Sequence, residues 1–241
     1  MSGARKVTTV RTTADPAATA HRERNRRGQG GRLRTDIVVA AAELLDEAGT
    51  EQAVTLRAVA RRIGIAAPSI YAHFADRQAI LLAVVQDAFA ELAQALRATA
   101  DAATATDSTR EEGAVARLHA ACTAYLDFAA TRPQRYRVMF GGLWNAGEAL
   151  DSAAVSAAEV TDLGQEALAV LVAALDACVA AGASTSTDTV ADAIALWLGL
   201  HGLAHQRAVI AAFPWPADIA ERLITSLAQL TRPPGSRPTA S

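Results

Sequence analysis

Residues Thr55–Arg77, TLRAVARRIGIAAPSIYAHFADR, decide the fold of this chain. The first part of this stretch repeats apolar residues at the spacing of one helical face, at Leu56, Val59, Ala60 and Ile63. Thr55 is a residue type that caps the start of a helix, and Gly64 is a type that ends one. The pattern therefore predicts a short helix from Thr55 to Ile63, with arginines on its exposed side.

A second short helix is predicted after the turn at Gly64. Pro68 suits its first turn, because the N–H that proline lacks would have no partner there. This helix can run only to Phe74 or so, since Asp76 offers the N-cap of the next helix. Two short helices joined by such a turn are typical of a helix-turn-helix, whose second helix enters the DNA major groove. A plain αα corner in any helical protein is the alternative.

The stretch resembles the N-terminal domain of TetR-family transcriptional regulators, and the likeness extends over residues 33–85 or so. It rests on Leu56, Val59, Ala60, Gly64, Ile65, Ile70, Tyr71, His73, Phe74, Arg77 and Leu81, and above all on the run IYAHFADRQAIL. Two positions depart from the family pattern. Ala66 stands where a Ser or Thr cap is usual, and Arg77 stands where Lys is common.

This resemblance implies a set of DNA contacts. It implies that Thr55 and Arg57 approach the DNA backbone, and that Tyr71, His73 and Arg77 hold phosphates. The residues implied to face base edges are Ala66, Ala67, Pro68 and Ser69. Three of the aromatic positions have structural alternatives. We expect Phe74 to be core and the Tyr71 hydroxyl to face DNA, while His73 has the alternative of an ordinary surface imidazole.

Charge is divided unevenly along the chain, although the net charge is only −2. Residues 1–80 hold 13 Lys and Arg against 8 Asp and Glu, whereas residues 81–241 hold 10 against 17. A basic head and an acidic body fit a protein that places one end against a polyanion. Residues 1–31 have almost no large apolar side chains, so we expect a disordered basic arm. Arg32 and Arg34 beside it are candidate DNA contacts; an inert basic tail is the alternative.

The composition is that of an all-α protein. Hydrophobic residues make up 51% of the 241 positions, aromatic residues are only 5%, and alanine and leucine dominate. A first helix is predicted over Leu33–Ala48, and a long helix of ~34 Å is predicted to begin after Asp76 and to belong to two domains. Further helices are predicted over Arg110–Thr131, Pro133–Phe140, Asp151–Ala181, Thr187–Ala212 and Pro216–Leu230. The sequence lacks a signal-like apolar N-terminus and a strongly apolar charge-free span, so we expect a cytoplasmic protein without membrane contact.

The C-terminal half carries a second resemblance. The segments RPQRYRVMF and ALWLGLHGLAH are similar to the tryptophan-histidine-glycine (WHG) type of C-terminal domain in some TetR-family members, with Trp197, His201 and Gly202 at the name positions. The resemblance also implies a homodimer through the last two helices, residues 187–230. Gly199 and Gly202 suit close approach of a partner helix, and packing within one chain is the alternative.

Chemistry beyond binding finds little support in the sequence. It has no Gly-rich phosphate loop, no G-x-S-x-G elbow and no H-E-x-x-H, so we expect no enzyme and no cofactor. Cys122 and Cys178 are interpreted as buried thiols, with a redox sensor as the alternative. His201 and His205 have a chelating spacing but no evident further ligand, so we expect no metal site.

The expected architecture is an N-terminal three-helix helix-turn-helix domain, residues 32–80, followed by a larger helical ligand-binding and dimerisation domain, residues 81–231, and a disordered tail, residues 232–241. We expect a dimeric repressor that binds a near-palindromic operator and is released by a small, largely apolar ligand. The candidate pocket residues are Cys122, Tyr125, Met139, Phe140, Trp144, Trp197 and His201. A ligand-independent DNA-binding protein and a helical enzyme or carrier remain as alternatives, and activator and repressor are not distinguished.

Overall fold

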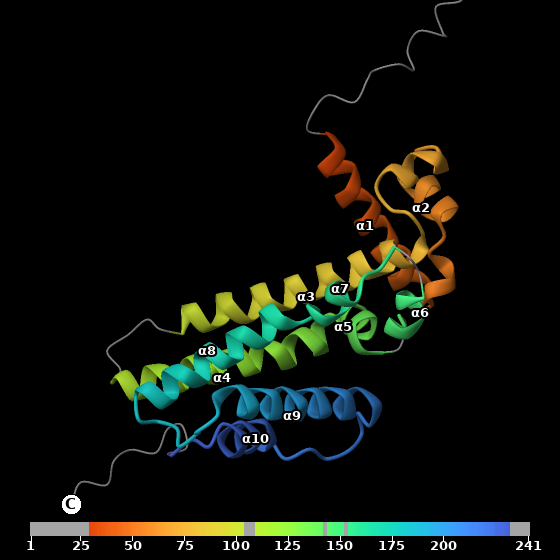
Figure 1. The fold of residues 1–241 in the computed structure, drawn as a ribbon. Coiled ribbons are helices and arrows are strands. Elements are labelled where there is room, and N and C mark those ends of the chain that lie inside the picture. The colour runs from red at the N-terminus through yellow and green to blue at the C-terminus, as the bar shows by residue number, and fades with distance from the viewer. Residues whose placement is uncertain (1–28, 104–108, 142–143, 152–153, 232–241) are drawn as a thin grey trace, which may run out of the picture.

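The computed structural model describes residues 29–103, 109–141, 144–151 and 154–231, and these form helices in two packed groups (Figure 1). The predicted arm and tail lie outside the described residues, apart from the last residues of the arm. The N-terminal group holds α1 (Gln29–Ala48), the 3₁₀ turn η2 (Glu51–Ala53), α2 (Leu56–Arg62) and the 3₁₀-helix η3 (Ala67–Ala72). The C-terminal group holds α4 (Arg110–Thr131), α5 (Pro133–Phe140), α6 (Ala146–Leu150), α7 (Ala157–Thr161), α8 (Gln165–Ala180), α9 (Thr189–Val209) and α10 (Ile219–Leu227). The long helix α3 (Arg77–Ala102) runs through both groups.

The helix-turn-helix forms as predicted, with its turn closed by backbone hydrogen bonds. The Thr55 side chain accepts from Ala58 N at 3.1 Å and caps α2. Gly64 has φ +71° at the other end, where Ile65 N donates to Ala60 O at 3.0 Å. This six-residue closure is a Schellman motif, which needs a left-handed residue at the glycine position. The turn therefore depends on Gly64.

The second helix of the motif is a 3₁₀-helix rather than an α-helix. Its N-cap, Ala66, makes no side-chain hydrogen bond, and Pro68 has no N–H to donate. Without a capping side chain, the segment tightens to bonds three residues apart, such as Ser69 N to Ala66 O at 2.9 Å. The first helix of the domain, α1, begins at Gln29, four residues before the predicted start at Leu33.

One helix contributes to both hydrophobic cores, as predicted. Asp76 caps α3 by accepting from Ala79 N at 2.9 Å. Near this end, Ile80 and Val84 are fully buried in a cluster with α1, α2 and η3. Further along, Leu92 and Leu96 are buried in the larger cluster with α4, α8 and α9. The proposed division at residue 80 therefore falls within a continuous helix.

The predicted bounds of α4 and α5 are confirmed. Thr109 and Glu112 form a capping box at the start of α4, which ends at Thr131. Pro133 then opens α5, and Gly141 follows its last residue.

The predicted single helix over residues 151–181 is wrong. A capping box of Ser156 with Glu159 starts the separate helix α7, and Gly164, at φ +77°, starts α8. The apolar spacing continues through both helices, so it does not reveal the break. The ring of Phe89 from α3 occupies the space at this break, because a Cβ atom on Gly164 would lie 2.9 Å from Phe89 Cε1.

The last two helices form a pair, and both are shorter than predicted. Asp188 caps α9, whose last residue is Val209, and α10 begins at Ile219. Residues after α10 pair with the α8–α9 connection, where Thr185 N donates to Gln229 O and Thr231 N to Ala183 O, both at 3.0 Å. This pairing, rather than a longer helix, accounts for residues 229–231.

Two segments are long and apolar enough to cross a membrane by length and composition alone. They are α3 and the span Ala157–Ala180, within the described residues. The apolar window of α3 is 56% buried inside the protein, and the second span is broken at Gly164. Core packing is a sufficient reason for the apolar character of α3.

Substitution of Gly164 by alanine should destabilise the fold more than substitution of Gly182. Both glycines have a left-handed φ, +77° and +78°, so both variants lose roughly 1 kcal/mol from backbone strain. Only Gly164→Ala also forces a Cβ against Phe89, whereas nothing lies within 4 Å of a Cβ on Gly182. Overpacking should add about 1–3 kcal/mol. Urea denaturation of both variants measures the difference, and equal losses would contradict the tight contact.

Candidate functional site

The helix-turn-helix presents a small surface whose exposed residues alternate with buried ones. Ile70 is fully buried and Phe74 is 3% exposed, so both fix η3 to the core; the expectation that Phe74 is core is confirmed. Tyr71 between them is 62% exposed, which is unusual for a large aromatic side chain. The remaining exposed or half-exposed residues of this surface are Ala66, Ala67, Pro68, Ser69 and His73. The sequence-predicted base-reading and phosphate residues of η3 are therefore brought together.

Arginines of α2 differ in their availability. Arg57 is exposed and, within the described part of the chain, has no carboxylate partner. Arg62 instead pairs with Glu43, at 3.1 Å, and with Glu47, both on α1. This pairing raises the pKa of Arg62 through its hydrogen bond with Glu47. Arg62 thus ties α2 to α1, while Arg57 is free to meet a polyanion.

The predicted contacts Arg77 and Arg34 each have a partner within the domain. Arg77 Nη2 lies 3.0 Å from Glu51 Oε1, so η2 holds the guanidinium in place. A guanidinium has five N–H donors, which leaves several for a phosphate. The Arg34 guanidinium carbon lies 4.3 Å from the centre of the Phe74 ring, a cation–π contact, and Arg32 is exposed on the same helix.

The C-terminal domain holds a partly open cavity of about 240 Å³ between α3, α4, α5, α8 and α9, which we call the inner cavity. Three of the predicted pocket residues line it: Tyr125, Phe140 and Trp197. The remaining lining residues are Phe89, Leu92, Leu96, Leu163, Gly164, Gln165, Ala167, Leu168, Leu171 and Ile194. Leu92 and Leu96 come from the predicted long helix α3. The α8 residues were not predicted to line a pocket, because the predicted continuous helix hid the turn at Gly164.

His201 lies behind the inner cavity in an aromatic cluster. Its Nδ1 lies 2.6 Å from Tyr136 Oη, and its ring centre lies 4.7 Å from that of Phe140. Burial, and then the charge of His205, lower the pKa of His201. The neutral imidazole can therefore accept the Tyr136 proton. Sequence reasoning missed Tyr136, although it lies on the face of α5 that also carries Phe140.

The other predicted pocket residues do not line the inner cavity. Cys122 is fully buried in the C-terminal core, and Met139 packs against that core. Trp144 packs instead against the N-terminal cluster and a small cluster around Leu82. The sequence grouped these three residues with the pocket because spacing along the chain does not show which side of a helix faces a cavity. It also does not show where the connection after α5 runs.

Both cysteines are buried free thiols, as interpreted from the sequence. Burial raises the pKa of Cys122 far above its usual range and that of Cys178 to about 11. Thiols that remain protonated at neutral pH are poor nucleophiles. Among the described residues, no group of three or more His, Cys, Asp or Glu side chains is arranged to hold a metal ion.

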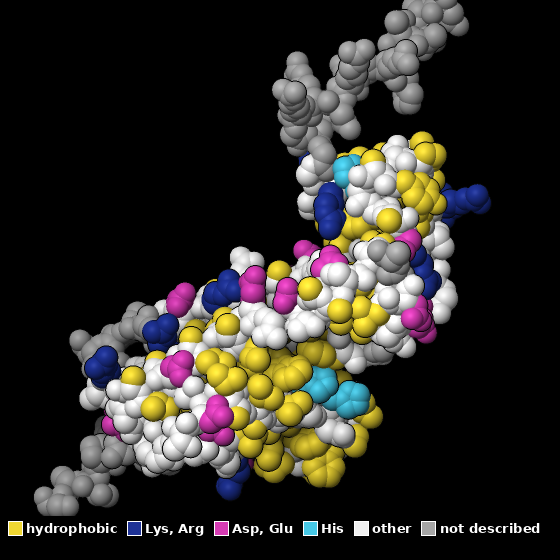
Figure 2. Space-filling view, viewed as in Figure 1, with side chains coloured by type: hydrophobic (Ala, Val, Ile, Leu, Met, Phe, Trp, Pro, Cys, Tyr) yellow, Lys and Arg dark blue, Asp and Glu magenta, His cyan; other side chains and the backbone are white. Residues whose placement is uncertain are grey.

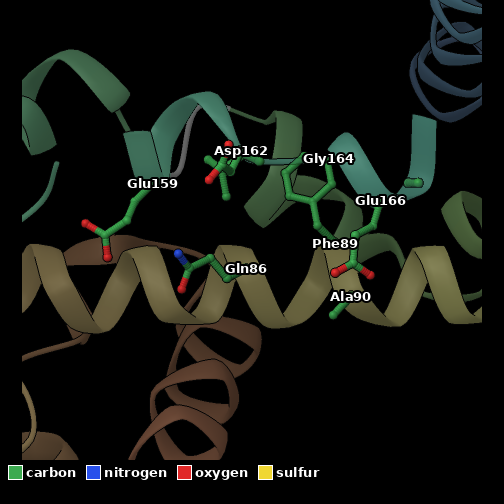
Figure 3. A pocket seen from close by; sticks show the side chains of 9 residues that line it. Gln86, Phe89, Ala90, Glu159, Asp162, Gly164 and Glu166 are labelled. Carbon is green, nitrogen blue, oxygen red and sulfur yellow. The ribbon is translucent and has the colours of Figure 1, made fainter. Parts of the chain in front are cut away.

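A second, shallower pocket of about 150 Å³ opens beside the inner cavity, between α3 and the α7–α8 break; we call it the outer pocket (Figure 3). Phe89 rises from α3 toward Gly164, and both residues line the outer pocket and the inner cavity. Three carboxylates, Glu159, Asp162 and Glu166, line the outer pocket. The Phe89 ring thus lies at the boundary between the two spaces.

One face of α9 exposes apolar side chains beside the inner cavity, which Ile194 of this face also lines. Val190, Ile194 and Leu198 follow each other at one-turn spacing and are 52%, 38% and 55% exposed. Figure 2 shows apolar surface gathered on the lower body of the molecule, the region of α8 and α9 in Figure 1. Gly202 is exposed, and a Cβ added there would meet nothing within 4 Å, whereas a Cβ on Gly199 would lie 2.6 Å from Leu227 on α10. The close approach at Gly199 is therefore made within one chain.

Comparison with known proteins gives two family matches. Residues 37–84 match the family described as bacterial regulatory proteins, tetR family, and residues 118–230 match the tetracyclin repressor-like C-terminal domain. The HTH-type transcriptional activator FasR of Mycolicibacterium smegmatis (strain ATCC 700084 / mc(2)155) is 30% identical over 141 residues, 53% of this chain. The chain spans 58% of the length of that relative.

Solved structures share the fold. A protein with unknown function from Rhodococcus sp. RHA1 has a TM-score of 0.61 at 23% identity, over 87% of this chain and 94% of that one. A TetR family transcription regulator from Marinobacter aquaeolei VT8 has a TM-score of 0.56 at 16% identity, over 86% of this chain and 100% of that one.

Acidification should destabilise the protein in part through His201. Its pKa is lowered in the folded state, so the unfolded chain binds more protons and stability is lost as pH falls below ~6.5. His201→Gln should therefore make the unfolding free energy fall less steeply between roughly pH 7.5 and 5.5. His73→Gln, outside this cluster, is the control. Urea titrations across the pH series provide the measurement, and an unchanged slope for His201→Gln would contradict the assignment.

Proposed function

Because the chain belongs to the TetR family of bacterial regulatory proteins, we propose that it binds a near-palindromic operator as a homodimer, represses transcription there, and is released by a small, largely apolar ligand. The observation that carries the DNA-binding part is the surface of η3. Two buried anchors, Ile70 and Phe74, hold Pro68, Ser69 and Tyr71 outward on a rigid turn. Side chains that project from the second helix of this motif reach base edges and phosphates.

The charge of the domain supports the same surface. Arg57 is exposed and unpaired within the described residues, and Arg77 is held by Glu51 with further donors available. Arg32 and Arg34 extend the basic surface along α1. Cations of this kind contribute sequence-independent affinity through counterion release. Thr55 caps α2 through its side-chain oxygen, and its hydroxyl proton is available to a phosphate.

Helix α5 supports control of DNA binding from the inner cavity. Phe140 on α5 lines the cavity and Tyr136 packs beside it, whereas Val138 between them is 4% exposed in the N-terminal core. Ion pairs also hold α5 on α3, since Arg135 lies 3.7 Å from Asp87 and Arg132 pairs with Glu91. A ligand that displaces Phe140 would therefore shift Val138 in the N-terminal core, where α5 packs against α1 and α3. Such a ligand shifts the equilibrium between the DNA-binding and the released arrangement only by the difference between its affinities for the two.

The exposed apolar face of α9, with α10 beside it, supports dimerisation through residues 187–230. A self-complementary pair of such faces buries the apolar side chains that a monomer leaves in water. Two helix-turn-helix units would then meet successive major grooves about 34 Å apart.

Activation instead of repression is the second candidate, because the relative FasR is named as an activator. The position of the operator decides between them. We also propose a cytoplasmic location, where the operator is accessible.

Arg57→Ala should reduce both the affinity for DNA and its salt dependence. Loss of one phosphate contact lowers the slope of log K against log salt by about one per subunit. The measurement is fluorescence anisotropy on DNA from upstream of the protein's own gene, against a scrambled duplex, across a salt series.

Arg62→Ala is the matched control for this test. Its guanidinium is engaged by Glu43 and Glu47, so the variant should lose stability and keep the salt slope. Equal slopes for wild type and Arg57→Ala would remove Arg57 from the interface. Equal, weak binding of both duplexes by wild type, followed by failure of a genome-wide selection of bound fragments, would overturn the DNA-binding proposal.

Val138→Ala should weaken communication between the inner cavity and the DNA-binding domain. The change opens space in the N-terminal core, where α5 packs against α1 and α3, and should cost about 1–3 kcal/mol of stability. It should also reduce, several-fold, the loss of DNA affinity caused by any small molecule that raises the Tm of wild type. Val155→Ala deletes the same atoms from a separate buried cluster and is the control. If both variants retain the full ligand response, α5 does not carry the signal.

A further inference from the structure

The inner cavity is uncharged along its whole lining. In the described part of the chain, its walls are leucine, isoleucine, alanine and aromatic side chains, with Tyr125, Trp197 and Gln165 as the polar groups. A carboxylate inside would leave water without a cation to meet it, which is strongly unfavourable. An uncharged apolar body would gain from burial at the same walls.

The outer pocket beside the cavity disfavours anions as well. Glu159, Asp162 and Glu166 line the outer pocket, and no cation is among its described lining residues (Figure 3). Arg97, 2.7 Å from Glu166, offsets one of these charges. Hydrogen bonds from Ser156 lower the pKa of Glu159, which keeps it ionised. An anion that enters past Phe89 therefore meets like charge first and an uncharged interior next.

Tyr125 is one of the polar side chains on the cavity wall, beside Trp197 and Gln165. Its Oη lies 3.3 Å from Tyr136 Oη, longer than the ~2.5–3.0 Å of a well-formed bond between hydroxyls, and 3.5 Å from His201 Nδ1. His201 Nδ1 is instead engaged by Tyr136 at 2.6 Å. Burial raises the pKa of Tyr125 far above its ordinary value, so its O–H remains a donor at any physiological pH. The Tyr125 O–H therefore donates only a long hydrogen bond to Tyr136, which a closer acceptor in the cavity can replace.

The volume limits the size of the ligand. An engineered cavity of ~150 Å³ with similar walls binds benzene. The inner cavity, at about 240 Å³, accepts one ring with a short substituent without rearrangement of its walls. The acceptor group of such a substituent can reach Tyr125 while the ring lies among the apolar side chains.

We propose that the effector is an uncharged, one-ring-sized apolar molecule with one hydrogen-bond acceptor that Tyr125 recognises, and that the site discriminates against carboxylates of the same shape. The inference rests on the proposed function, since it names the ligand class of the same cavity.

Three probes of nearly one shape test this proposal: acetophenone, ethylbenzene and benzoate. Titration calorimetry and Tm shifts of the full chain at pH 7.5 should rank them in that order. Acetophenone should bind at least about tenfold more tightly than benzoate, because the carboxylate loses its hydration without a partner. Benzoate binding as tightly as acetophenone would overturn the proposal. Failure of all three to bind at millimolar concentration would overturn it too.

Two matched variants locate the hydrogen bond. Tyr125→Phe should weaken acetophenone binding about three- to tenfold, the effect of one neutral hydrogen bond, and leave ethylbenzene binding unchanged. Tyr136→Phe removes a hydroxyl that does not line the cavity and should change neither affinity by more than about twofold. Leu168→Trp fills the cavity and should abolish binding of both. Equal losses for Tyr125→Phe and Tyr136→Phe would remove Tyr125 as the recognising group.

Operator binding measured beside these titrations tests the ligand class and the ligand-induced release from DNA separately. Probes that bind in the expected order without weakening DNA binding would leave the ligand class intact and refute ligand release. If benzoate binds best and releases the DNA, ligand release would stand and the proposed ligand class would be refuted.

Discussion

The continuity of α3 is the constraint on which the rest of the structure depends. Asp76 fixes its start, directly after the helix-turn-helix, and the helix then continues through Leu92 and Leu96 into the C-terminal core. Long helices curve gently but kink sharply only at features such as proline or a π-bulge, and the 26 residues of α3 include neither proline nor glycine. Under the proposed function, a change at the cavity end of α3 would therefore move its N-terminal end as well. Phe89, between the two cores, is the point on α3 nearest both pockets.

Helix α5 is a second physical link between the inner cavity and the N-terminal core, beside α3. Its residues alternate between the two domains, with Phe140 toward the cavity and Val138 toward the N-terminal core. Arg135 and Arg132 hold it on the acidic side of α3. Half-exposed ion pairs contribute little net stability, so they fix geometry more than they resist movement. Packing at Val138 is the stiffer link, since well-packed cores respond to displacement as units.

Local signals predicted most of the helical framework, because capping and turn chemistry act over a few residues. Thr55, Gly64, Asp76 and Pro133 each start or stop a helix where the sequence indicated. The break at Gly164 was missed, since apolar periodicity continues across it and only the packing of Phe89 shows why the chain turns there. The DNA-facing surface lies within one continuous motif, so its residues are adjacent by local geometry. The cavity draws on five helices, α3, α4, α5, α8 and α9. Spacing along the chain could place Tyr125, Phe140 and Trp197 together but could not exclude Trp144.

The proposed DNA-binding surface depends on charged side chains, whereas the inner cavity binds by apolar burial. DNA affinity depends on cations, and among the described residues Arg32 and Arg57 are exposed without a carboxylate partner, while Arg62 and Arg77 are paired with carboxylates. Cations add affinity for any DNA sequence, so base contacts from η3 must supply the selectivity. The proposed ligand needs only to shift the balance between a DNA-binding and a released arrangement. Reversal of a two-state population from 1:99 to 99:1 takes ~5.5 kcal/mol, and a shift of one decade takes ~1.4 kcal/mol. Burial of a single ring and one hydrogen bond at Tyr125 supplies the smaller figure when only one of the two arrangements offers this site, because the shift equals the difference in affinity. A small apolar effector is therefore energetically sufficient for this switch, and the structure does not require a large or highly charged one.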